Sequence, residues 1–300
     1  MRDKQAWLIP LPALIVIVLL VAFSLLNRTI AVTDDGQYLY ISCIELLAVA
    51  LPAAFFCKLR GVGYLSELNI RFIDPSGALL SVICALIMVM ASACMRVLLI
   101  SFGIGSTALS LYGFFLPDAS SDIASGLYSV VVYALLPSLI EEFFFRSVLM
   151  REYKRAGALT AVIVPTVLFA LTSLSVSGFM TRLLCGLILA TLVFVTKSVL
   201  AAVIAHFLFA VYELFLQPYI LEFASKPDNR IFLFFLLGAV LLLLLVLAFG
   251  EAERLFYRRA VNNEPYTSVR GSFGKLLRCL LSPVFLLSCG VFLIYILLLR

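Results

Sequence analysis

The chain contains nine apolar runs, most of them close to the roughly twenty residues that an α-helix needs to cross the hydrocarbon core of a bilayer. The runs are residues 7–26, 38–57, 78–102, 127–150, 158–174, 180–195, 198–219, 231–249 and 280–299. Because 64% of the 300 residues are hydrophobic and 13% are charged, a soluble fold could not cover this apolar surface. The sequence therefore predicts an all-α, polytopic transmembrane helix bundle of about nine spans. It excludes soluble enzymes, disordered chains, disulfide scaffolds and nucleic-acid-binding proteins.

The positions of Lys and Arg predict the orientation of this bundle. If the N-terminus is cytoplasmic, fifteen of these residues fall on inside segments and five on outside segments, as the positive-inside rule requires. Residues 103–126 contain no Lys or Arg, which suits an outside loop. The first run has no small-x-small cleavage site before Asn27, so we interpret it as a retained signal anchor. The expected location is a bacterial plasma membrane, with membrane lipid as a partner.

Three regions organise the predicted bundle. Residues 1–126 hold N-terminal helices, residues 127–219 carry the polar motifs described below, and residues 220–300 hold C-terminal helices. Between spans, residues 58–77 mix apolar and charged side chains and are expected to lie along the membrane interface. Residues 251–278 form the longest polar segment and are expected to be a cytoplasmic loop.

Charged residues inside the apolar runs are few, and a charge at membrane depth usually has a partner or a function. Glu45 and Arg96 lie at similar distances from the outer ends of neighbouring runs. We therefore expect them to form a structural ion pair, with a role in transport or substrate binding as the alternative.

The fourth run carries the densest group of charges. On a helix, Glu142 and Arg146 are four residues apart and can pair on one face, whereas Glu141 points about 100° away and has no local cation. Pro137 lies one turn earlier and is expected to kink the helix beside Glu141. A carboxylate in such a position can accept a proton from a buried water molecule. The alternative is a helix end stabilised by the Glu142–Arg146 pair.

His206 is the single histidine of the chain and lies about eight residues into the seventh run. At ~1.5 Å per residue, this places it near the expected depth of Glu141. Glu213 follows seven residues later on roughly the same helical face. A lone histidine on an apolar helix is often a packing residue, but the matched depth favours a shared site with the carboxylates.

At these residues the sequence resembles the CPBP family of CAAX-protease and bacteriocin-processing intramembrane endopeptidases. The run EEFFFR from Glu141 to Arg146 is similar to the family motif EExxxR. The segment FALTS ending at Ser173 occupies the position of the second motif, FxxxH, and the segment HFLFA beginning at His206 occupies that of the third, HxxxN. The separations are 32 and 33 residues, and the resemblance covers residues 127–219.

The resemblance implies peptide-bond hydrolysis inside the membrane by glutamate-activated water. Glu141 would be the base, Glu142 and Arg146 would orient the site, and His206 would stabilise the oxyanion. The implied substrate is a membrane-associated peptide or protein, and no cofactor is implied.

Two positions depart from the family pattern. Ser173 stands where a histidine is expected and Ala210 where an asparagine is expected. Serine can hold water by hydrogen bonding but cannot take up a proton near neutral pH, and alanine can do neither. These departures make a catalytically inactive membrane scaffold, or an immunity-like protein that binds partner helices or peptides, the main alternative function.

Other chemistries find less support in the sequence. A divalent metal held by Glu141, Glu142 and His206 is one alternative, although the chain lacks an H-E-x-x-H helix. The segment from Ser175 to Gly178 partly matches a rhomboid-like serine protease but lacks the leading glycine. A transporter would rest on span count and intramembrane charge alone.

Overall fold

The structure is a computed structural model that describes residues 8–29, 34–61, 68, 70–103, 110–111, 114–115, 123–261 and 273–298. Within these ranges, regular structure is almost entirely helical, and the exception is a pair of two-residue antiparallel strands, β1 (Ser110–Leu111) and β2 (Phe114–Phe115). The predicted all-α fold class is therefore confirmed.

The N-terminal helices include one continuous helix that is interrupted by a π-helical segment. They are α2 (Leu11–Thr29), then the continuous series α3 (Asp34–Ile44), η1 (Glu45–Ala50) and α4 (Leu51–Arg60), and finally α5 (Pro75–Ser101). The segment η1 is π-helical, and the N–H of Leu51 bonds to the carbonyl of Leu46, five residues earlier. Pro52 follows directly and has no N–H to continue the α-helical register.

The fourth apolar run contains two further π-helical segments. It comprises α6 (Ile123–Ser129), η3 (Val130–Leu135), α7 (Leu136–Glu142), η4 (Phe143–Leu149) and α8 (Met150–Lys154) without a break. The π-helical segments η3 and η4 lie on either side of α7. Pro137, at the start of α7, follows η3 just as Pro52 follows η1. The helix is continuous through Pro137, and the expected kink at this residue stays a prediction.

The remaining helices complete the bundle. They are α9 (Ala158–Leu171), α10 (Val176–Thr196), α11 (Val199–Phe215), α12 (Gln217–Ser225), α13 (Pro227–Val261), α14 (Phe273–Leu280) and α15 (Pro283–Leu298). Because α13 continues to Val261, the prediction of a loop beginning at residue 251 was wrong for residues 251–261. Residues 262–272 lie outside the described ranges, as do residues 62–67 and 69 of the predicted interfacial segment and residues 104–109, 112–113 and 116–122 of the predicted outside loop.

All nine predicted runs overlap helices, but not every helix is long enough to span a bilayer by itself. Five are long and apolar enough, and the number rises to seven if the bent pairs α11 with α12 and α14 with α15 each count as one span. Two shorter apolar helices cover Leu11–Asn27 and Ala158–Leu171. The count of nine and the orientation of the N-terminus stay predictions.

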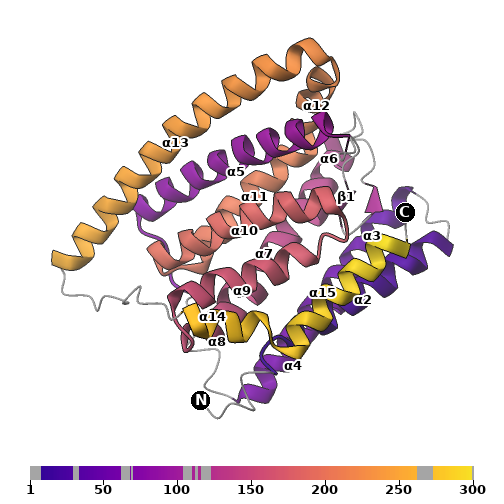
Figure 1. Cartoon of the computed structure of the whole chain (residues 1–300), viewed down its shortest axis with the longest axis vertical. Coiled ribbons are helices and arrows are strands. Elements are labelled where there is room, and N and C mark those ends of the chain that lie inside the picture. Colours follow the sequence, from indigo (N-terminus) through magenta and orange to yellow (C-terminus); the bar gives the residue numbers. More distant parts are fainter. Residues whose placement is uncertain are drawn as a thin grey trace.

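Several helices that are far apart in the sequence pack against one another (Figure 1). Helix α13 lies along α5, which packs against α10 and α11, and α10 packs against α9. At the other side of the molecule, α15 lies along α2. The main buried core joins these groups through fully buried side chains such as Ile17, Met88 and Phe144.

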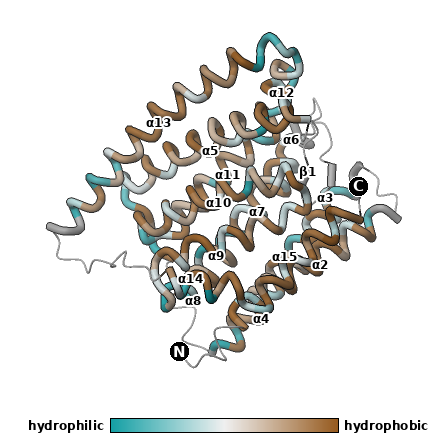
Figure 2. Tube along the Cα trace, in the orientation of Figure 1, coloured by the Kyte–Doolittle hydropathy of each residue, from teal (hydrophilic) through white to brown (hydrophobic). Residues whose placement is uncertain are grey.

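The outer helices present apolar side chains outward, as lipid contact requires. Hydrophobic residues predominate along α13, α2 and α15, and hydrophilic residues gather near the ends of α13 (Figure 2). On α13, the side chains of Ile231, Phe235 and Val246 are each at least 68% exposed. A soluble protein rarely exposes such a continuous apolar face, so this surface fits a bilayer.

Candidate active site

The two adjacent glutamates of α7 lie in the interior of the bundle. Glu141 is 1% exposed and Glu142 is fully buried. The Nε atom of Arg146 lies 3.1 Å from Oε2 of Glu142, which confirms the ion pair expected from their spacing of four residues. Carboxylates at this depth need charged or hydrogen-bonding partners, because isolated burial of an ion is costly.

His206 on α11 bridges the two glutamates. Its Nδ1 atom lies 2.9 Å from Oε1 of Glu142, and its Nε2 atom lies 3.8 Å from Oε2 of Glu141. In the neutral tautomer that donates the Nδ1 hydrogen to Glu142, Nε2 is an acceptor that faces Glu141. The structure therefore brings together His206 and both carboxylates of the predicted site.

Arg182 on α10 supplies a cation that the sequence analysis did not assign to the site. Its Nη1 atom donates to Oε1 of Glu141 at 2.9 Å and to Oγ1 of Thr172 at 2.7 Å. The spacing of charges along one helix could not reveal this partner of Glu141, because Arg182 comes from a different helix. Span boundaries had put Arg182 at the membrane edge, but α10 begins at Val176 and carries this side chain to the site on its second turn.

The aromatic ring of the second-motif segment contacts two guanidinium groups. The ring centroid of Phe169 is 4.2 Å from Cζ of Arg146 and 5.1 Å from Cζ of Arg182. The ring also meets the imidazole of His206 edge-on, with centroids 6.0 Å apart. Cation–π contacts of this kind are worth more when they are desolvated, so Phe169 helps to fix the positions of both arginines.

A tight turn between α9 and α10 carries Ser173 into the same region. Its hydroxyl donates to the carbonyl of Ala170 at 2.9 Å and lies 3.2 Å from that of Ser175. The next residue, Leu174, has a left-handed φ of 51°, which is strained for a side chain of this size. Ser175 caps α10 by accepting the N–H of Gly178, so it has a structural role that explains the partial serine-protease match.

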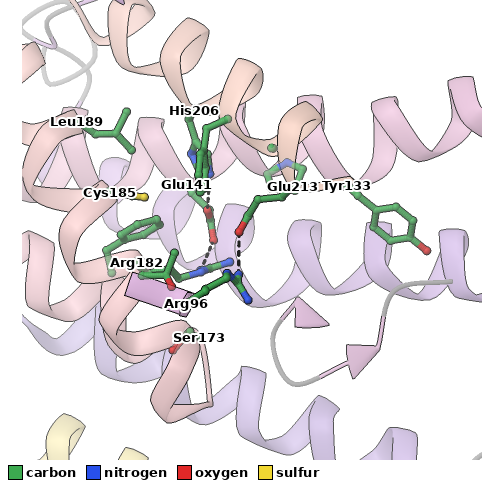
Figure 3. Close-up of a pocket in the computed structure, with 15 residues that line it drawn as sticks. Arg96, Tyr133, Glu141, Ser173, Arg182, Cys185, Leu189, His206 and Glu213 are labelled. Atoms are coloured by element: carbon green, nitrogen blue, oxygen red, sulfur yellow. Dashed lines mark hydrogen bonds and ion pairs between the residues drawn. The ribbon is translucent and has the colours of Figure 1, made fainter. Parts of the chain in front are cut away.

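Several of these side chains line a small cavity of about 60 Å³ (Figure 3). At about 10–15 Å³ per molecule, this volume holds a few waters. The lining residues that bear on its chemistry are Glu141, Ser173, Arg182, His206, Ala210, Arg96 and Glu213. Ser173 therefore lies at the cavity together with Glu141.

Arg96 forms a second ion pair on the cavity wall, and its partner differs from the predicted one. Its Nη2 atom donates to Oε1 of Glu213 at 2.9 Å (Figure 3). The Gln217 amide, with its oxygen turned toward Arg96, accepts from the same guanidinium. Glu45 instead lies buried in η1. Equal depth in the membrane did not identify lateral neighbours, because α5 packs against α11.

The described residues contain no group of three or more His, Cys, Asp and Glu side chains that could hold a metal ion. At the predicted Glu141, Glu142 and His206 group, the oxygens of Glu142 already contact Arg146 and His206. Because both oxygens of Glu142 face these two side chains, they are poorly placed to bind a metal ion as well.

Comparison with known protein families identifies the segment that carries these motifs. Residues 123–212 match the family model described as type II CAAX prenyl endopeptidase Rce1-like. No curated protein and no solved structure gave a significant match. The match, together with at least five apolar helices, supports an integral membrane protein. Residues 123–212 are thus similar to the Rce1-like endopeptidases, in agreement with the resemblance expected from the motifs in this region.

Proposed function

We propose that this protein is an intramembrane endopeptidase that hydrolyses a peptide bond with water activated by Glu141. The observation that carries the proposal is the approach of Glu141 Oε2 to His206 Nε2, 3.8 Å apart, at the wall of a cavity large enough for a few water molecules. Both residues come from the segment that matches the endopeptidase family. The proposed substrate is a membrane-associated peptide or protein.

In this proposal, one water molecule donates its two hydrogens to Glu141 and His206. Its oxygen lone pair attacks the peptide carbonyl, and Glu141 takes the proton as the new C–O bond forms. Glu142 holds the Nδ1 hydrogen of His206 and so keeps Nε2 directed at the water. Here His206 acts on the water, which differs from the oxyanion role that the resemblance implies.

The proposed topology sets the site within reach of the cytoplasmic side. We retain nine spans with a cytoplasmic N-terminus, since every predicted run overlaps a helix and fifteen Lys and Arg fall on inside segments. A bacterial plasma membrane is the proposed location. Cysteine accessibility labelling at Lys226→Cys, on the proposed outside, and at Lys58→Cys, on the proposed inside, tests this orientation.

The decisive experiment compares Glu141→Gln with the unmodified protein. Both are reconstituted in liposomes with a library of membrane peptides, and products are identified by mass spectrometry. Glutamine keeps the size and some hydrogen bonding of Glu141 but removes the base, so products should fall by about 10² to 10⁴-fold. Glu251→Gln, which alters an exposed ion pair with Arg254, is the matched control and should cleave normally. Products that are the same with Glu141→Gln would contradict the proposal.

A catalytically inactive scaffold is the second candidate, and the Arg182–Glu141 ion pair favours it. The Arg182 guanidinium occupies one oxygen of the Glu141 carboxylate, and the site lacks the histidine and asparagine expected at Ser173 and Ala210. The double variant Ser173→His with Ala210→Asn separates the two functions. An increase in turnover would support a working cleft, whereas a folded but inactive double variant would support the scaffold.

A further inference from the structure

If the protein is an endopeptidase as proposed above, its site needs a group that donates a hydrogen bond to the oxyanion of the intermediate. The cavity presents few such groups. Ala210 has no donor, and the Ser173 hydroxyl is directed to backbone carbonyls. In the tautomer described above, His206 offers an acceptor to the cavity. The hydroxyl of Tyr133 points away from Glu141 (Figure 3). The strong donors on the wall are therefore Arg182 and Arg96.

The two arginines differ in what their partners do during the reaction. Arg96 is paired with Glu213, which takes no part in the proposed proton transfer. Arg182 is paired with Glu141, which loses its negative charge when it accepts the proton of water. At that moment Arg182 is left with a neutral partner in a low-dielectric cavity, where an unmatched charge is costly.

We propose that Arg182 is a catalytic residue whose guanidinium binds two anions in turn. It pairs with the Glu141 carboxylate before the reaction and with the oxyanion of the tetrahedral intermediate once Glu141 is protonated. As the water oxygen bonds to the carbonyl carbon, the π electron pair of the carbonyl moves to its oxygen, and the water proton moves to Glu141. The negative charge thereby passes from Glu141 to the substrate oxygen beside Arg182. When the C–N bond breaks, the oxyanion re-forms the carbonyl and Glu141 returns the proton to the leaving nitrogen.

The surroundings of Arg182 suit such an exchange because they hold its side chain independently of Glu141. Thr172 accepts from Nη1 at 2.7 Å, and the ring of Phe169 lies 5.1 Å from Cζ. A guanidinium has five N–H donors in a planar fork, so it can keep the Thr172 bond while a second oxygen replaces the carboxylate. The side chain is 16% exposed, which is consistent with access to the cavity.

The first test uses Glu141→Gln to imitate the protonated base and needs no substrate. Thermal unfolding is followed in detergent with rising sodium acetate, against sodium chloride at equal ionic strength. Acetate should raise the unfolding midpoint of Glu141→Gln in a saturable manner, because Arg182 then binds the carboxylate of acetate. The unmodified protein, the Glu251→Gln control and the double variant Glu141→Gln with Arg182→Gln should show no such rise.

Glu141→Ala serves as a second background if Glu141→Gln folds poorly. No acetate-specific rise in a folded Glu141 variant would overturn the proposal. An equal rise in the double variant with Arg182→Gln would also overturn it, because the anion would then bind elsewhere.

The second test measures cleavage by Arg182→Gln and Arg182→Lys in the liposome assay. Loss of an oxyanion donor should lower kcat by about 10² to 10³-fold with little change in KM, and lysine should restore part of the rate as a point charge. A merely structural role would be revealed by parallel loss of folding, and undiminished kcat in Arg182→Gln would overturn the proposal. If acetate binds as expected but no Glu141-dependent cleavage is found, the endopeptidase proposal fails while the anion site stands.

Discussion

Nδ1 of His206 lies 2.9 Å from Oε1 of Glu142, a residue whose other carboxylate oxygen contacts Arg146. One fully buried carboxylate thus fixes the imidazole from α11 and the guanidinium from η4. Because each contact uses a different oxygen, Glu142 links two helices and sets the direction in which Nε2 of His206 faces. The adjacent Glu141 remains available to a different helix, α10, through Arg182.

The first prediction concerns this buried ion pair. Arg146→Gln should lower the free energy of unfolding by about 3–5 kcal/mol, because Glu142 keeps a buried charge and loses its strongest partner. The double variant Glu142→Gln with Arg146→Gln should recover a large part of that loss, since no uncompensated charge remains. Thermal unfolding in detergent measures both. A double variant less stable than Arg146→Gln would contradict this account.

A second prediction concerns close packing beside Arg146. A Cβ atom added at Gly186 would lie 3.0 Å from Phe169 Cδ1, 3.1 Å from Thr166 Cγ2 and 3.3 Å from Arg146 Nη2. Gly186→Ala should therefore destabilise the protein by about 1–3 kcal/mol. At Gly238 in α13 nothing lies within 4 Å of the added atom, so Gly238→Ala should be neutral or stabilise by up to about 1 kcal/mol. Equal unfolding midpoints for the two variants would exclude a packing origin.

A third prediction concerns the end of α10. Lys197 adopts a left-handed φ of 54° at the C-cap, a position where glycine carries no steric penalty. Lys197→Gly should raise the free energy of unfolding by about 0.5–1 kcal/mol, whereas Lys197→Ala should give no comparable gain, since alanine keeps the strain. Urea or thermal unfolding of the three proteins measures this difference. Stabilisation by alanine to the same extent would assign the effect to loss of the lysine side chain.

The fourth prediction concerns the contact between the terminal helices. The hydroxyl groups of Ser24 on α2 and Tyr295 on α15 lie 2.5 Å apart and form a buried hydrogen bond. Tyr295→Phe and Ser24→Ala should each cost about 1–2 kcal/mol. In a double-mutant cycle the combined variant should cost less than the sum of the single variants, because the bond is lost only once. Strict additivity would show that the two hydroxyl groups do not stabilise each other.

The sequence predicted those site features that depend on local spacing. The Glu142–Arg146 pair follows from a separation of four residues, and the shared site of Glu141 and His206 follows from matched depth and motif spacing. The helical character of each apolar run was also readable, because hydrocarbon solvent leaves few alternatives for the backbone.

Contacts that depend on which helices lie side by side could not be predicted from spacing along the sequence. Arg96 pairs with Glu213 and not with Glu45, because depth along a helix says nothing about which helix lies beside it. Arg182 was missed since the start of α10 was placed at residue 180, and the true start at Val176 moves this residue one turn into the bundle. Four residues of boundary error were enough to hide the cation that contacts Glu141.

The π-helical segment η4 has a consequence for insertions and deletions in this motif. Residues 143–149 carry one more residue per hydrogen-bonded loop than an α-helix, and the N–H of Met150 bonds to the carbonyl of Phe145. Deleting one of the three phenylalanines would let the rod return to α-helical register without breaking it. The separation of Glu142 and Arg146 would then fall from four residues to three, so the length of EEFFFR matters as much as its composition.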